Sequence, residues 1–405
     1  MNAICLVVDR LHIGHVGTYG NSWIETPEID RLAAEAFVFD HALIDSPRLE
    51  TLYQSYWQGH HPLSQTRPDK THPTLARLLS TAGISTTLLT DDPRIARLQS
   101  AQDFDELVEI ETPKGDKVAP DINHTQFARC FAQIIDWLNS ARGPFLLWAH
   151  LTGMAGAWDA PWEFRSRYVE PGDPPPPPSA LVPELILEED YDPDRLLGIC
   201  QVYSGQVSFL DTCVGALMEF LRAERMSAET LLVLSSARGF PLGEHRRVGA
   251  CDDALYGELT QVPLLIRFPD SIGAAARSHA LVEPLDLPVT LLDWWRVPDD
   301  LPVSVGKSLM PLVREEKGAV RDRLCIAGVN AEWAIRTPAW YLRNGNPPEL
   351  FAKPDDRWEV NTVADRCHDV VDQLQEAFSQ YRHFLQSSLT ATLPPLNEIL
   401  VSGLD

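Results

Sequence analysis

The sequence predicts an α/β fold: a large, doubly wound, mostly parallel sheet flanked by helices, followed by a small C-terminal antiparallel sheet with one helix. The first observation is a set of short, unbroken apolar runs, such as 4–8 and 230–234, separated by stretches of helical spacing. Such runs are typical of strands buried on both faces of a parallel sheet. The second observation is that polar residues follow directly where these runs stop. In open α/β sheets the ligand site lies beyond the carboxyl ends of the strands, so these residues are the first site candidates.

The elements of the large sheet follow one another from the N-terminus. Thr26 precedes Pro27 and an apolar stripe at helical spacing, which predicts a helix with Thr26 as its N-cap. Thr51 is the predicted N-cap of a second helix, which Gly59 ends. Further strands are predicted at 37–39, 84–89, 145–149 and 262–269, and further helices within 74–82, 127–138, 207–221 and 286–293.

The pattern changes near residue 321. An apolar stripe from Val370 to Leu385 predicts one long helix, and it follows short strands predicted at 324–329, 333–337, 339–343 and 349–353. We therefore expect an α/β domain over 1–318 and a small α+β subdomain over 319–405. Within the first domain, five consecutive prolines at 174–178 predict a stiff surface loop, and the acidic stretch 183–194 predicts a solvated segment.

Composition and charge exclude several classes of function. The 405 residues are 44% hydrophobic and 22% charged, which is ordinary for a globular protein. The formal net charge of −23 argues against nucleic-acid backbones and anionic membrane surfaces as partners. Seven cysteines without paired spacing favour reduced thiols. The first apolar run is short and no stretch is long enough to span a bilayer, so we expect a cytoplasmic protein without a signal peptide.

Four motifs near the N-terminus resemble those of the sulfatases, a family of the alkaline phosphatase superfamily. They are Asp9-Arg10-Leu11, Tyr19-Gly20-Asn21, the segment 26–33 and Asp45-Ser46-Pro47. The similarity continues to the end of the chain. It implies the sulfatase fold, together with a site in which a Cys or Ser is converted to formylglycine beside a divalent cation held by about four oxygen ligands.

The residues at the family's catalytic positions depart from the family motif. The nucleophile position carries Leu49, whose side chain has no lone pair, and the activating Arg position carries Tyr53. Thr51 stands where the modification motif has Pro. We therefore expect no formylglycine and no catalytic residue of the family type. Thr51 as a relocated nucleophile at a helix N-terminus is the alternative to its role as an N-cap.

The metal-ligand positions have changed as well. Asp9 remains, but Arg10 replaces its neighbouring ligand, and Ala237 and Arg238 stand in place of the Asp and His of a later Ser-Asp-His-Gly motif. One carboxylate beside two guanidinium groups supplies too few oxygen ligands, and charge repulsion opposes a divalent cation. The resemblance, with these substitutions, implies that neither calcium nor magnesium is bound, and we expect no cofactor.

Two acidic residues, Asp91 and Asp252, stand at the family's sulfate-binding lysine positions. We therefore hypothesise that the charges of the pocket have been exchanged and pair with one another. Arg10 or Arg238 would pair with Asp9. Asp91 or Asp252 would accept the other guanidinium group. The alternative is that these side chains point to solvent.

Histidines offer further alternatives. His245 beside Glu244 is either a satisfied loop histidine or a general base, and Met154 stands near the position of a family histidine. His60 and His61 are adjacent on an extended segment and point apart, which favours a surface position, or a position behind the residues that line a site, over a metal-binding role. A metal site formed by Asp9 with His12 and His15 is also conceivable. The predicted ligand pocket comprises Asp9, Arg10, Asp91, Met154, Arg238, His245 and Asp252.

Two hypotheses for the function follow. The first is a catalytically inactive sulfatase-like protein, a pseudo-sulfatase, with a binding, regulatory or companion-subunit role. Its partner would be an unknown small ligand or a protein, and it could form a homo-oligomer or pair with an active relative. The second is a rewired sulfuric or phosphoric ester hydrolase that uses a non-standard nucleophile or metal site. A purely structural role is a third alternative.

Overall fold

The structure is a computed structural model that describes all of the chain except residues 65–71, 113–114, 302–304, 387–391 and 404–405. The described residues form two compact units, each built from three separate segments of the chain. The first unit comprises Met1–Asp40, Gly83–Cys251 and Val262–Arg277, and the second comprises His41–Ala82, Asp252–Gln261 and Ser278–Asp405.

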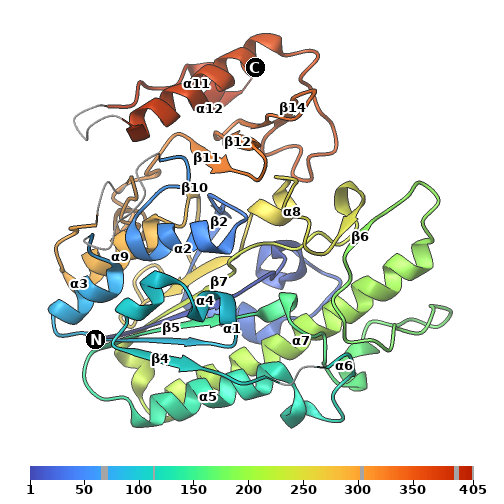
Figure 1. The fold of residues 1–405 in the computed structure, drawn as a ribbon, viewed down its shortest axis with the longest axis vertical. Helices are drawn as coiled ribbons and strands as arrows, with labels where there is room; N and C mark the ends of the chain where they lie inside the picture. Colours follow the sequence, from blue (N-terminus) through green and yellow to red (C-terminus); the bar gives the residue numbers. More distant parts are fainter. Residues whose placement is uncertain (65–71, 113–114, 302–304, 387–391, 404–405) are drawn as a thin grey trace. The chain divides into compact units, whose positions relative to one another are not determined.

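The large sheet has eight strands. Those that were predicted from apolar runs lie where the sequence placed them. The eight strands are β1 (Asn2–Val8), β2 (Phe37–Ala42), β3 (Ser85–Thr90), β4 (Glu106–Glu109), β5 (Phe145–Leu151), β7 (Thr230–Ser235), β9 (Leu264–Arg267) and β10 (Arg277–Val282). Their order across the sheet is β10-β2-β9-β7-β1-β5-β3-β4 (Figure 1). The five strands from β7 to β4 are parallel, and β9 is antiparallel to both β7 and β2. The predicted mostly parallel sheet is confirmed.

Helices of the first unit pack against one another and share a core with the central strand. They are α1 (Pro27–Glu35), α4 (Pro93–Ala96), α5 (Gln126–Ser140), α6 (Trp162–Arg165) and α7 (Pro193–Ala223), with the 3-10 helices η1 (Ile13–His15), η2 (Gly17–Tyr19), η3 (Gln99–Asp103), η4 (Ile122–His124), η5 (Gly153–Ala155), η6 (Met226–Ala228) and η7 (Glu244–Arg246). The long helix α7 contacts both α1 and α5. Ile29, Phe127 and Leu210 from these three helices join Leu6 of β1 in one buried cluster.

The N-terminus of α1 shows how distant residues replace a local cap. Thr26 is the N-cap residue, but its hydroxyl accepts a hydrogen bond from Gly17 N at 2.9 Å instead of capping the helix. The carboxylate of Asp211 in α7 takes that role, since it accepts from Glu28 N at 3.2 Å and from Ile29 N at 2.7 Å. Thr26 is therefore the N-cap residue, as predicted, but its side chain does not cap the helix, and Asp211 instead fixes α1 to α7.

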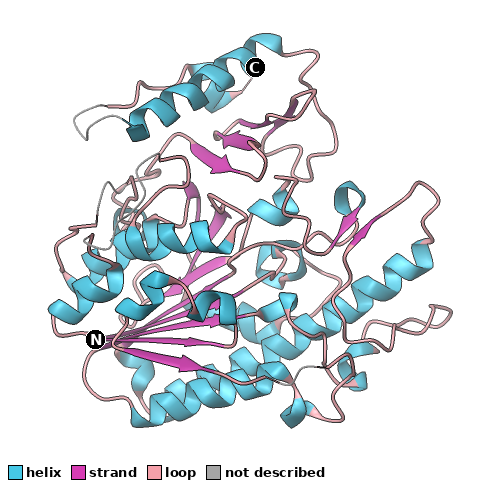
Figure 2. Cartoon of the chain, viewed as in Figure 1, coloured by secondary structure: helices cyan, strands magenta, loops and turns pink. Residues whose placement is uncertain are grey.

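The second unit contains the small sheet predicted at the C-terminal end. Its strands β11 (Leu324–Ala327), β12 (Trp333–Arg336), β13 (Trp340–Arg343) and β14 (Glu349–Ala352) pair antiparallel in chain order (Figure 2). Helix α11 (His368–Gln386) packs on this sheet, where the ring of Phe378 stacks on Trp333 with centroids 3.8 Å apart. The other helices of this unit are α2 (Leu49–Gln58), α3 (Leu75–Thr81), α8 (Gly257–Thr260), α9 (Asp286–Trp295), α10 (Met310–Val313) and α12 (Glu398–Ser402).

The two compact units differ from the predicted division between 318 and 319. Helix α9 packs against α2 and α3, and Leu63 and Val305 pack against the core of the small sheet. These contacts gather 41–82 and 278–318 into the same unit as the C-terminal subdomain. A change of pattern along the chain marks where the small sheet begins, but it does not reveal which earlier segments pack with it.

The acidic stretch before α7 is exposed or half-buried except at Leu187, as predicted, and it contains one short strand. Within it, β6 (Leu185–Ile186) pairs antiparallel with β8 (Arg247–Val248). In the described part of the chain, no helix is both long enough and apolar enough to cross a membrane.

Candidate functional site

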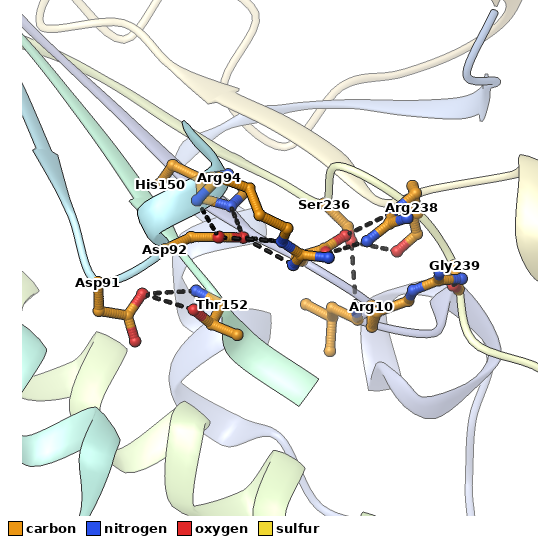
Figure 3. A network of polar contacts seen from close by, with 11 residues as sticks. Arg10, Asp91, Asp92, Arg94, His150, Thr152, Ser236, Arg238 and Gly239 are labelled. Carbon is orange, nitrogen blue, oxygen red and sulfur yellow. Dashed lines mark hydrogen bonds and ion pairs between the residues drawn. The ribbon is translucent and has the colours of Figure 1, made fainter. Parts of the chain in front are cut away.

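Charged side chains collect in the first unit where its parallel strands end (Figure 3). Asp9 directly follows β1, Asp91 and Asp92 follow β3, and Arg238 stands three residues after β7. The strands are aligned so that their carboxyl ends meet, since Val8 pairs with Leu151 of β5. The sheet therefore places three of the predicted pocket residues, Asp9, Asp91 and Arg238, at one edge.

Asp9 and Arg238 form a buried ion pair with two hydrogen bonds. Arg238 Nε donates to Asp9 Oδ1 at 3.1 Å, and Arg238 Nη2 donates to Asp9 Oδ2 at 2.5 Å. Asp9 is 0% exposed and Arg238 is 4% exposed. The hydroxyl of Ser236 accepts from Leu11 N at 3.1 Å and donates to Arg238 O at 2.6 Å, which ties the two strand ends together. The predicted pairing of Asp9 with a guanidinium group is present, and Arg238 is the partner.

The electrostatics of this pair favour the charged form of Asp9. Burial alone would raise the pKa of the Asp9 carboxyl. The charge and hydrogen bonds of Arg238, with a smaller effect of the Arg10 charge, hold that pKa below its ordinary value. The carboxylate is thus ionised at neutral pH, and a protein cation balances it.

The backbone of Arg10 has an unusual conformation. Its φ of 66° lies in the left-handed region, which few residues other than glycine adopt. The side chain is buried, and its Nη1 donates to Gly239 O at 3.3 Å (Figure 3). Its own carbonyl accepts from the hydroxyl of Tyr203 at 2.7 Å.

The groups that donate hydrogen bonds to the carboxylate of Asp91 are uncharged. Asp91 accepts from Gln126 Nε2 at 2.5 Å, from Thr152 N at 2.7 Å and from Thr152 Oγ1 at 3.0 Å. The expectation that Asp91 accepts a guanidinium group is therefore wrong. The physical reason is its position beside the first turn of α5 and the loop after β5, where amide and hydroxyl donors satisfy the carboxylate.

A second charged group at the same edge follows no sequence motif. The buried carboxylate of Asp92 accepts from Arg94 Nε at 3.0 Å and Arg94 Nη2 at 2.7 Å, and His150 Nε2 lies 3.7 Å from Asp92 Oδ2. Burial opposes ionisation of Asp92, but the close approach of His150 and the hydrogen bonds of Arg94 lower its pKa below the ordinary value. The side chain of Arg94 is 57% exposed, so it is the solvent-facing member of the group. Only the alignment of Thr90 in β3 with His150 in β5 brings these residues together.

Glu244 is paired with His12. His12 Nδ1 accepts from Gly14 N at 2.7 Å, so its Nε2 carries the proton that faces Glu244 Oε1 at 3.3 Å. Burial raises the pKa of Glu244, but the contact and charge of His12, together with the hydrogen bond from Leu242 N, outweigh burial and bring that pKa to about 2. His245 is half-buried with a left-handed φ of 48°.

His15 lies in the same cluster of rings. Its ring meets the rings of His12 and Tyr203 edge-on, with centroids 5.0 and 5.1 Å away. Burial, with the charge of His12, lowers the pKa of His15 to about 3. Because His12 is turned to Glu244, these histidines do not form the conceivable metal site with Asp9.

Met154 belongs to the core of the first unit. Its side chain is fully buried in the large apolar cluster, and its backbone N donates to Asp9 O at 2.9 Å. The preceding Gly153 has a φ of 61°, and a Cβ there would lie 2.3 Å from Asp9 O. The loop after β5 is thus packed directly on the backbone of Asp9, which requires glycine at this position.

Four predicted site positions lie in the second unit. Leu49 is the buried first residue of α2, and Arg48 is its N-cap residue, so Thr51 lies within the first turn and is not the cap. Tyr53 is fully buried, with its ring centroid 4.5 Å from that of Trp57. Asp252 is half-buried in a turn before α8.

His60 and His61 are both buried, which contradicts the surface position, the first of the two expected placements. His61 Nδ1 accepts from Leu63 N at 3.1 Å, and its Nε2 lies 3.9 Å from Glu283 Oε2. Burial lowers the pKa of His61 to about 3. The turn after α2 folds these side chains into the second unit, a placement that adjacency in sequence does not reveal.

The residues at the metal-ligand positions do not fit a divalent cation. Both oxygens of Asp9 accept hydrogen bonds from Arg238, and the side chains of Arg10 and Ala237 contain no oxygen. Hard cations such as calcium need six or more oxygen ligands, usually with several carboxylates. Within the described residues, no three His, Cys, Asp or Glu side chains are grouped so that they could hold a metal ion.

The fold is that of the alkaline phosphatase superfamily, and the chain belongs to the sulfatase family. The Sulfatase family model matches residues 1–297. The chain is 34% identical over 204 residues to an N-acetylglucosamine-6-O-sulfatase of Bacteroides thetaiotaomicron. The aligned region covers 44% of this chain and 36% of that protein. The chain is 23% identical over 370 residues to human iduronate 2-sulfatase, which covers 74% of this chain and 66% of that protein. These matches span about a third and about two thirds of the two relatives.

A solved structure gives the same fold. The phosphonate monoester hydrolase of Agrobacterium radiobacter superposes with a TM-score of 0.75 at 16% identity, over 93% of this chain and 94% of that chain. At this identity the similarity establishes the fold alone.

Proposed function

We propose that this sulfatase-family protein does not hydrolyse sulfate esters and acts by binding, as a pseudo-sulfatase. The ion pair between Asp9 and Arg238 carries the proposal, because a guanidinium group engages both oxygens of the carboxylate that a family metal site requires. Leu49 at the nucleophile position supports it, since an aliphatic side chain supplies no attacking group. No formylglycine and no calcium or magnesium enter the proposal.

The proposed role is that of a binding, regulatory or companion subunit. Its partner would be a small ligand or a protein, and self-association or pairing with an active relative is part of the proposal. Sulfated saccharides are the first ligands to test, because two relatives carry the names of an N-acetylglucosamine-6-O-sulfatase and an iduronate 2-sulfatase.

Activity and metal content test the proposal together. The purified protein is assayed with 4-nitrophenyl sulfate and 4-nitrophenyl phosphate, with and without added calcium or magnesium, and its metal content is measured. We expect no turnover above that of buffer and no stoichiometric metal. Turnover that the Asp9→Asn substitution abolishes, or one bound metal ion per chain, would overturn the proposal and favour the rewired hydrolase.

A variant with the family's ligand chemistry provides the matched control. Arg10→Asp, Ala237→Asp and Arg238→His together return two carboxylates and remove both guanidinium groups beside Asp9. We expect this variant to bind calcium in isothermal titration calorimetry and the native protein to bind none. Calcium binding by the variant alone would show that these three side chains prevent metal binding in the native protein.

A further inference from the structure

A cavity of about 550 Å³ lies in the first unit and shares no residue with the charged groups at the strand ends. Its walls are the proline-rich loop, the end of the acidic stretch and the first turns of α7, with Trp158 and Ile199 among the lining residues. Small-molecule sites typically have volumes of roughly 300–1,000 Å³. Two sequence features that predicted only a surface loop and a solvated segment thus line one cavity of ligand size.

The cavity is held open by a buried arginine. Arg165 is fully buried, and its Nη1 donates to Trp158 O at 2.5 Å. Its Nη2 donates to Pro177 O at 2.5 Å and to Ser179 O at 2.8 Å. All three acceptors belong to residues that line the cavity. One planar guanidinium group therefore fixes the proline loop relative to Trp158, and a site fixed in advance loses less freedom on binding.

Helix α7 forms the opposite wall at close range. A Cβ at Gly198 would lie 3.1 Å from Pro177 Cδ, so the helix and the proline loop are already in contact there. Two contacts hold the side chain of Trp158 in place. Its Nε1 donates to Met154 O at 2.9 Å, and the centroid of its ring lies 5.4 Å from that of Tyr203. The indole is thus fixed in place, and the cavity does not depend on a mobile side chain.

The residues that line the walls favour a ligand with a flat, apolar ring system. The lining includes four proline rings and the aromatic rings of Trp158 and Tyr191, whereas Ser179 is the one hydroxyl-bearing aliphatic side chain among the lining residues. A saccharide would bury many hydroxyl groups here without partners, which is costly. An aromatic ring system fits these surfaces, because aromatic side chains stack on planar apolar groups.

The rim selects the charge of the ligand. Asp192 and Asp194 line it together with a single guanidinium group, that of Arg195. Arg195 Nε lies 3.8 Å from Asp192 Oδ2, so Asp192 already has a cation and Asp194 supplies the excess negative charge. An ammonium group at this rim also gains from the faces of nearby aromatic rings. We propose that this cavity binds a small aromatic amine in its protonated form, at a site separate from the strand-end crevice.

Three probes with one naphthyl body test the proposal: 1-naphthylmethylammonium, 1-naphthalenemethanol and 1-naphthoate. Their dissociation constants for the full chain are measured by isothermal titration calorimetry. We expect the ammonium probe to bind about threefold to tenfold more tightly than the carboxylate probe, as exposed charges contribute modestly. Asp194→Asn should reduce this difference. Glu219→Gln, which removes an exposed charge further along α7, should leave it unchanged.

Two cavity variants make the test decisive. Val202→Trp should fill the cavity and abolish binding, and Leu181→Ala, at a side chain that is 65% exposed and therefore safe for folding, should weaken binding several-fold. The proposal is overturned if none of the probes binds saturably. It is also overturned if both variants bind the ammonium probe as the native chain does, or if the carboxylate probe binds most tightly.

Discussion

Replacing Arg238 with methionine should destabilise the protein strongly. The substitution leaves the carboxylate of Asp9 fully buried without its principal cation. Loss of one partner of a buried ion pair typically costs about 3–5 kcal/mol of the free energy of unfolding. An exposed pair provides the control: Arg195 is 76% exposed and lies 3.8 Å from Asp192, so Arg195→Met should cost less than about 1 kcal/mol.

Urea denaturation of a double-mutant cycle measures this effect. The substitution Asp9→Asn removes the buried charge, so the double variant with Arg238→Met should lose less stability than the sum of the single variants, by about 2 kcal/mol or more. The folded-state pKa of Asp9 is lowered, so its stabilising contribution is present at neutral pH and is lost as the pH falls through that pKa. The cost of Arg238→Met should therefore shrink below about pH 4. Additive costs, or a cost independent of pH, would refute the reasoning.

Two further substitutions test the second unit and the backbone of the site. Burial raises the pKa of Glu283 from 4.5 to about 7, so the folded protein keeps a proton that the unfolded chain releases. Stability should fall as the pH rises from 4.5 to about 7, and Glu283→Gln should remove that part of the pH dependence of Tm; an unchanged profile would contradict this. Gly153→Ala should cost at least about 3 kcal/mol, because its Cβ would overlap the carbonyl of Asp9 as well as strain a left-handed φ. Gly143→Ala, at a φ of 73° with open space around the Cβ, should cost only about 1–2 kcal/mol, and equal costs would show that the overlap is unimportant.

The fold was predictable where the chain's apolar pattern is strong. The unbroken runs of β1 and β7 and the helical stripe of α7 identify buried elements without any knowledge of their neighbours. Strand β4 (Glu106–Glu109) has only two apolar residues, flanked by glutamates, at the sheet edge, and β10 begins with polar residues, so neither gives a clear apolar run. The compact units were not predictable, because the packing of α9 on α2 joins segments more than two hundred residues apart.

The site was predictable only as far as strand order allows. Asp9 and Arg238 follow two strands whose motifs meet in the sulfatase family, so their pairing could be inferred. The turn of Arg10 toward Gly239 depends on a left-handed backbone, and residue type alone does not indicate this. The approach of His150 to Asp92 depends on the adjacency of β3 and β5, and no local sequence pattern indicates that these two strands are neighbours.

The proposed exchange of a metal ion for a guanidinium group has a physical basis in the fold. The end of a fully buried central strand leaves the carboxylate of Asp9 no access to water, so it must be neutralised by a metal ion, a proton or a side-chain cation. Arg238 supplies two hydrogen bonds as well as charge, and Ser236 fixes its backbone to the strand end. An arginine held in this way satisfies the oxygens that a metal would use. Removal of Arg238 alone should therefore not restore a metal site, because Arg10 would still place a positive charge beside Asp9 and Ala237 would still contribute no ligand.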